Sequence, residues 1–144
     1  WYTGEYTNSV SSASWRTRIA QLDLTTGPPP PRVFIHVADL DGSTTVVRKS
    51  WRASVRVLVH DADGVPMANV TVSGMWSGAT TGGASCVTDA AGTCTVSTGS
   101  LNSKKTSVVL TITALSHATA SYDAAANDDP DPDSDGTVIT VTRP

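Results

Sequence analysis

The chain has 144 residues, a formal net charge of −3 and only 16% charged residues, and Thr, Ser, Gly and Val are abundant. This length suits one domain, or one domain with an appendage, and the composition favours strands and turns over helices. The net negative charge argues against a nucleic-acid partner, no apolar stretch is long enough to predict a membrane span, and the start at Trp1 predicts a processed product or a fragment.

Residues 1–32 form a polar and aromatic segment that ends in a run of prolines. The pattern from Trp15 to Leu24 favours an extended strand over a helix, because Thr25 to Gly27 would stop a helix there. The run Pro28–Pro31 predicts a stiff polyproline spacer. We therefore expect an extended N-terminal segment with a Pro-rich spacer over residues 1–32, and a folded domain over residues 33–144.

Short strand patterns follow one another after this spacer. The clearest lies between Trp51 and His60, where apolar residues alternate with polar ones and predict one buried face. The other predicted strands are Val33–Val37, the inward-facing sets Val70, Val72 and Trp76, then Val108, Leu110, Ile112 and Ala114, then Ala118, Ala120 and Tyr122, and the last strand Thr137–Thr142. Seven or eight strands without a convincing helix predict an all-β fold, an immunoglobulin-like β-sandwich with an extended N-terminal strand segment.

The two cysteines, Cys86 and Cys94, flank a turn signal at Asp89 to Gly92. A β-hairpin around this turn would place them opposite each other, so we predict a cross-strand disulfide; two free buried thiols are the alternative. The spacing is not that of a zinc or redox motif. A disulfide would imply an oxidising, extracellular compartment, so we expect a secreted or cell-surface protein.

The segment Asn127–Gly136 carries the strongest chemical signal, because its aspartates are too close together for an ordinary solvated loop. Its second half matches the opening of an EF-hand calcium loop, but Thr142 stands where the bidentate Glu would be and neither flank has helical periodicity. We therefore predict a Ca²⁺ loop within β-structure; a disordered acidic linker is the alternative.

The first strand and the strand that ends at Tyr122 should lie side by side and parallel in an immunoglobulin-like order, which would bring Asp39 and Asp41 near the acidic loop. The predicted ligands of one or two Ca²⁺ ions are Asp39, Asp41, Asp129, Asp131, Asp133 and Asp135. For Asp39 to Gly42 alone, a simple turn is the alternative interpretation.

Two stretches resemble a known family. The run Asp61-Ala-Asp-Gly-Val-Pro-Met-Ala-Asn-Val70 and the turn Thr88-Asp-Ala-Ala-Gly92 resemble bacterial immunoglobulin-like domains of the invasin and adhesin type, over about residues 50–122. The cysteine pair and the acidic loop depart from that family. Residues 1–24 resemble the closing segment of secreted sialidase-like β-propellers, which would make this chain the C-terminal part of a larger exported protein.

Nothing in the sequence predicts catalysis. The histidines His36, His60 and His117 form no local metal or catalytic motif, and the sequence contains no nucleophile elbow and no phosphate-binding loop. We therefore expect a non-catalytic structural or adhesive module that binds a cell surface or a polysaccharide and forms a homopolymer by strand addition of residues 1–27. Packing of residues 1–27 on the sandwich of the same chain is the alternative to the homopolymer. The alternative is the C-terminal accessory domain of a secreted hydrolase.

Overall fold

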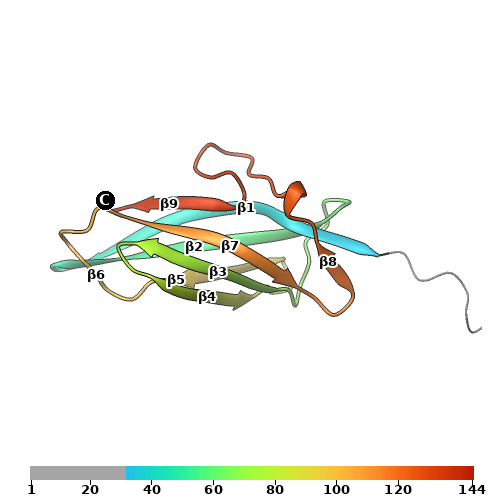
Figure 1. Ribbon diagram of the computed structural model, residues 1–144, viewed down its shortest axis with the longest axis horizontal. Coiled ribbons are helices and arrows are strands. Elements are labelled where there is room, and N and C mark those ends of the chain that lie inside the picture. Colours follow the sequence, from blue (N-terminus) through green and yellow to red (C-terminus); the bar gives the residue numbers. More distant parts are fainter. Residues whose placement is uncertain (1–31) are drawn as a thin grey trace, which may run out of the picture. The chain divides into compact units, whose positions relative to one another are not determined.

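The computed structural model describes residues 32–144, which form two β-sheets (Figure 1). The strands are β1 (Val33–Val47), β2 (Ser50–Asp61), β3 (Thr71–Gly78), β4 (Gly82–Val87), β5 (Thr93–Ser97), β6 (Leu101–Asn102), β7 (Ser107–Ser116), β8 (Ala120–Tyr122) and β9 (Val138–Thr142), with a 3₁₀ turn at Ala124–Ala126. One sheet has the order β5-β2-β1-β8, with β6 also paired to β2, and the other has the order β4-β3-β7-β9. The predicted all-β sandwich is confirmed. The predictions for residues 1–31 lie outside the described residues.

The neighbour relations follow the immunoglobulin arrangement. In that arrangement the first, second and fifth strands are neighbours in one sheet, and the third, sixth and seventh in the other. Here β1, β2 and β5 are neighbours in one sheet, while β3, β7 and β9 are neighbours in the other. The chain between β7 and β9 is unusually long and carries β8, the 3₁₀ turn and the acidic loop, as Figure 1 shows.

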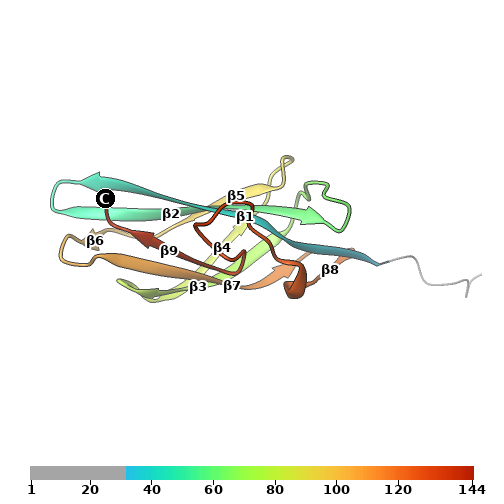
Figure 2. The same cartoon turned by 90° about the horizontal axis from the view of Figure 1, so that it is seen from above.

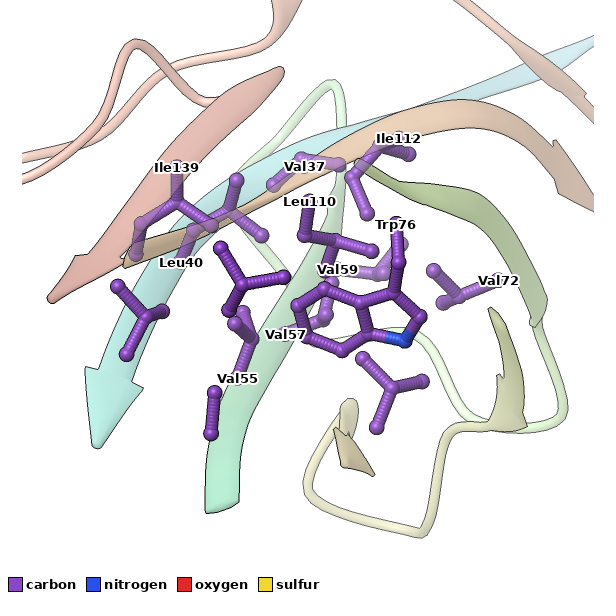
Figure 3. Packing of buried hydrophobic residues seen from close by; sticks show 14 of the residues in the cluster. Val37, Leu40, Val55, Val57, Val59, Val72, Trp76, Leu110, Ile112 and Ile139 are labelled. Atoms are coloured by element: carbon purple, nitrogen blue, oxygen red, sulfur yellow. The ribbon is translucent and has the colours of Figure 1, made fainter. Parts of the chain in front are cut away.

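The core lies between the two sheets and is built by period-two alternation. Along β2, Trp51, Ala53, Val55, Val57 and Val59 are all buried, as predicted. Figure 3 shows Val55, Val57 and Val59 of β2 facing Trp76 of β3 and Leu110 of β7. Because the two sheets share this apolar layer, residues on the outer faces remain free for other roles.

Strand β1 is longer than the sequence predicted. It continues past Val37 to Val47, and a bulge at Ala38 shifts the register of its pairing with β2. The segment Asp39–Gly42 is therefore extended strand and not a turn. Because of the bulge, Leu40 points to the same side of the sheet as Val37, and both side chains are buried in the core. The predicted parallel pairing with the Ala118–Tyr122 region is confirmed, because β8 pairs in parallel with Val33 to Ile35.

A second bulge changes the inward face of β7. Val108, Leu110 and Ile112 are buried as predicted, but Ala114 is exposed and Leu115 is buried in its place. The pairing of β7 with β3 skips Thr113, so the residues beyond it point to the opposite side. The prediction that Ala114 faces the core was therefore wrong.

The cysteines are joined by a disulfide with an S–S distance of 1.98 Å. The predicted bond is thus present, but the predicted hairpin is not. Cys86 lies on β4 and Cys94 on β5, which belong to different sheets, so the bond links the two sheets at one edge of the sandwich. No helix among residues 32–144 has the length and hydropathy that a membrane crossing requires.

Candidate metal centre

The acidic loop is held against the edge of β1 that β2 leaves free. Beyond β8, Asp123 N donates to Ile35 O, and Asp128 N donates to Val37 O at 2.9 Å. Figure 2 shows this loop alongside β1, on the same side of the molecule as β9. The loop thus continues the covering of β1 that β8 begins.

Asn127 fixes the base of the loop through its side-chain amide. Its Oδ1 accepts a hydrogen bond from Val37 N at 2.9 Å. Its Nδ2 donates to Tyr122 Oη at 2.7 Å and to Thr137 Oγ1 at 3.0 Å. One side chain therefore connects β1, the end of β8 and the residue that precedes β9.

Two carboxylates of the loop bind backbone amides of β1. Asp129 Oδ2 accepts from Leu40 N at 3.2 Å, and Asp133 Oδ2 accepts from Gly42 N at 3.5 Å. Ser134 Oγ also donates to Asp129 Oδ2. These contacts place the loop aspartates beside Asp39 and Asp41, which project from the same stretch of β1.

The carboxylates form two groups of three that share one member. Oxygens of Asp39, Asp129 and Asp131 lie within 4.8 Å of one another, and so do oxygens of Asp41, Asp131 and Asp133. Five of the six residues that the sequence singled out as metal ligands are therefore brought together. Two hard cations bridged by Asp131, or one cation between the groups, would fit this arrangement of oxygens.

Asp135 is the predicted ligand that lies outside both groups. Its Oδ1 accepts from Thr137 N at 2.9 Å and from Val138 N at 2.7 Å, and these bonds lower its pKa. Asp135 thus closes the loop at the start of β9. Asp135 completes the partial EF-hand match in the sequence, but it belongs to neither group.

The crowded carboxylates affect one another's protonation. Burial raises the pKa of Asp39, and the neighbouring carboxylates raise it further, with Arg56 acting in the opposite direction. Partial burial, followed by a hydrogen bond with Asp131, raises the pKa of Asp133 to about 6, although the Gly42 amide opposes the rise. For both residues burial is the main cause, and the neighbouring carboxylates add to the rise in pKa.

Two features of this centre suit a cation ligand set. Asp39 Oδ1 is buried and has no hydrogen-bond partner. Burying an unpartnered carboxylate oxygen costs free energy, and coordination to a cation would offset this cost. The only salt bridge among the described residues joins Arg56 to Asp41 at 2.9 Å, and half of the Arg56 side chain is exposed. One screened cation does not balance five carboxylates, so the donor set fits Ca²⁺ or a similar oxygen-binding ion.

The histidines do not add a second centre within residues 32–144. His36 and His60 are cross-strand partners with ring centroids 6.4 Å apart, and His117 Nδ1 accepts from Thr119 N in a separate loop. Every group of three or more metal-binding side chains among the described residues consists of aspartates.

The sequence interpretation missed the residues that shape the loop. Asn127 and Ser134 act through side-chain hydrogen bonds that no local motif predicts. Gly136 has a φ of 78° and lies against the Asp128 backbone. The Asp-Gly pair that ends the acidic run is a turn signal from which this glycine could have been predicted.

Comparison of the chain with protein-family models, with curated proteins and with solved structures gave no match.

Proposed function

We propose that this chain is a non-catalytic, extracellular structural or adhesive module whose β-sandwich is stabilised by Ca²⁺. The observation that carries the proposal is the convergence of five aspartates from β1 and the acidic loop, with a buried oxygen of Asp39 left unpartnered. A cation here joins β1 of one sheet to the chain that leads into β9 of the other. We assign this cation a structural role, because the same aspartates hold the loop on the backbone amides of Leu40 and Gly42 in β1.

A thermal-shift titration tests the calcium part of the proposal. Calcium that is present at 100 times its dissociation constant adds about 2.7 kcal/mol of stability per ion, which corresponds to a rise in Tm of about 10 °C for a domain of this size. We expect this rise when EDTA-treated protein receives Ca²⁺ and a smaller one with Mg²⁺, which prefers octahedral sites that keep several waters.

The shared ligand supplies the matched variants for this titration. Asp131→Asn should abolish most of the calcium response, because Asp131 belongs to both groups. Asp63→Asn removes the same charge from an exposed turn outside both groups and should respond like the unmodified chain. Equal melting temperatures in EDTA and in millimolar Ca²⁺ would refute a stabilising calcium site.

Self-assembly by strand addition is a second proposed property, and the outer edge of β9 supports it. Thr137 O accepts from Ile112 N, and Arg143 N donates to Thr106 O. The antiparallel alternation between these bonds directs the N–H of Thr142 away from β7, whereas nearer the start of β9 the acidic loop already bridges this edge, at Ser134 and Ile139. A shallow groove of about 190 Å³ lies along this edge, lined by Gly42, Ser43, Thr44, Asp133, Thr140, Val141 and Thr142.

We infer that residues 1–27 of a neighbouring copy would add to this edge. Thr142→Pro removes the outward N–H without disturbing the ladder to β7, so it should abolish large assemblies in light scattering while the chain stays folded. Unchanged assembly in this variant, or monomers of the unmodified chain at every concentration, would rule out addition at β9.

A further inference from the structure

The two ends of the sandwich carry opposite charge. Residues 32–144 contain eight Lys and Arg residues, and six of them gather at the end formed by the β1–β2 turn, β6 and the end of β9. These six, which we call the basic pole, are Arg48, Lys49, Arg52, Lys104, Lys105 and Arg143. No Asp or Glu occurs in residues 42–60, 90–122 or 136–144, so no carboxylate side chain from these segments offsets the basic pole.

Pairing and hydrogen bonds hold the segments of the basic pole together. Trp51 of β2 pairs with Leu101 of β6, and Trp51 Nε1 donates to Lys105 O at 3.1 Å. The guanidinium of Arg143 donates to Ser103 O at 2.6 Å. Figure 1 shows the β1–β2 turn, β6 and the C-terminus at the same end of the sandwich. The six charges therefore share one rigid surface, although they come from three parts of the chain.

The end of β1 adds apolar side chains to this surface. Val46 and Val47 are 59% and 55% exposed, and they directly precede Arg48 and Lys49. As consecutive strand residues they point to opposite faces, so both faces of the hairpin end are apolar. Exposed apolar side chains beside a basic turn are the combination that binds lipid bilayers at their interface.

The neighbouring cleft favours lipid over other anionic partners. It has a volume of about 160 Å³ and is lined by Thr45, Val47, Ser50, Trp51, Arg52 and Ser100. Arg52 and the hydroxyls of Thr45 and Ser100 are suitable donors for a phosphate group. Trp51 is only 1% exposed and offers no face on which a base or a sugar could stack.

We propose that the basic pole is a docking surface for a membrane that contains anionic lipid. Val46 and Val47 enter the headgroup region, and the six basic side chains lie over the lipid phosphates. Docking is reversible, because no lipid-facing helix or large apolar area supports it, and it is sensitive to salt. It depends on neither the acidic loop nor Ca²⁺, so it goes beyond the function proposed above.

Vesicle flotation with the full chain, in EDTA so that Ca²⁺ bridges no lipids, tests this proposal. The chain should float with phosphatidylcholine vesicles that contain phosphatidylglycerol and not with phosphatidylcholine alone. Raising the ionic strength from about 0.01 M to about 1 M shortens the Debye length from about 30 to about 3 Å and should release it. Lys104→Gln should weaken binding about fivefold, whereas Arg32→Gln, which removes a charge at the other end of β1, should have little effect.

The valines separate lipid from other polyanions. The double variant V46S/V47S should lose vesicle binding, and Val87→Ser, which removes a similarly exposed valine on β4, should retain it. All of these positions are exposed, and circular dichroism checks that each variant is folded. The proposal is overturned if anionic vesicles do not bind the chain at low salt. It is also overturned if V46S/V47S binds them fully and soluble dextran sulfate competes, because the basic pole would then be a site for hydrated polyanions.

Discussion

Gly136 determines whether the acidic loop can close onto β9. Its φ is 78°, and a Cβ at this position would lie 2.6 Å from both N and O of Asp128. Gly64 has a nearly identical φ of 81° in an open turn, with nothing within 4 Å of its Cβ position. The two glycines therefore share the same backbone requirement but differ in their surroundings.

Gly136→Ala should destabilise the chain more than Gly64→Ala. Both variants incur the cost of a left-handed residue, about 1–2 kcal/mol, and only Gly136→Ala must also move the Asp128 backbone. Chemical denaturation measures the two free energies of unfolding. Equal losses would mean that the loop yields easily, which would contradict a rigid ligand framework.

Asp133 gives the calcium-free protein a predictable response to pH. Its pKa in the folded state is about 6, above the usual value of 3.8, so the folded chain binds more protons than the unfolded chain between about pH 4 and pH 6. Stability from this group is therefore present at low pH and is lost as pH rises through 6. Asp39 acts in the same direction, whereas the lowered pKa values of Asp89 and Asp135 act mainly below pH 4.

We expect the Tm in EDTA to fall when pH is raised from about 5 to about 7.5. Asp133→Asn should reduce this fall, because it removes the group with the raised pKa, and Asp63→Asn should leave it unchanged. Saturating Ca²⁺ should reverse the trend, since the ion binds the ionised carboxylates. A Tm in EDTA that rises over this interval, in the unmodified chain, would show that Asp133 is not strained by its neighbours.

Among the strands, the alternation of apolar and polar residues predicted which faces are buried. The buried faces of β2 and of the segment from Val70 to Trp76 follow directly from period-two patterns, and so does the first part of β7. Bulges at Ala38 and Thr113 were missed, because an inserted residue leaves the composition of a strand unchanged while it reverses every later side chain.

The sequence predicted that Asp39 and Asp41 lie near the acidic loop, but not which of the loop aspartates lie beside them. Asp39 and Asp41 were paired with the loop because the parallel neighbour of β1 follows from the order of strands. Whether Asp129 or Asp135 lies beside β1 depends on the conformation of the acidic loop. Asn127 fixes this conformation through a hydrogen bond with Val37, and Gly136 through its close approach to the Asp128 backbone. The sequence therefore placed all four loop aspartates among the predicted ligands, whereas the carboxylate of Asp135 binds the amides at the start of β9.

The disulfide connects elements that the sequence placed in one hairpin. Since Asp89 N donates to Thr93 O, the chain turns tightly at the corner, yet β4 pairs with β3 and β5 pairs with β2. The bond therefore closes the edge of the sandwich opposite to β1 and β9.

The double variant C86S/C94S should unfold with a free energy lower by about 2–3 kcal/mol, as expected for a short closed loop. Its calcium response should be preserved, because the acidic loop lies at the other edge. Thermal unfolding with and without Ca²⁺ measures both effects. A double variant that no longer responds to Ca²⁺ would mean that the two edges of the sandwich are coupled.

At the scale of the whole molecule, the charges are divided among three regions. The aspartates of the candidate metal centre lie along the middle of β1, the basic pole lies at the β1–β2 turn, and Asp61, Asp63 and Asp89 lie in the turns at the opposite end. Ca²⁺ would neutralise the first region and leave the other two unchanged. The net charge of −3 therefore hides a separated distribution, which gives stability and surface binding different determinants.

Calorimetric titration of the EDTA-treated chain with Ca²⁺ measures whether the aspartates of the candidate metal centre bind this ion. Two groups of three carboxylates that share Asp131 predict saturable binding of one or two ions per chain, with a dissociation constant of about 10⁻³ M or below. Asp131→Asn should remove this binding, and Asp63→Asn should preserve it. The absence of saturable heat in the unmodified chain up to millimolar Ca²⁺, or full binding by Asp131→Asn, would contradict the account.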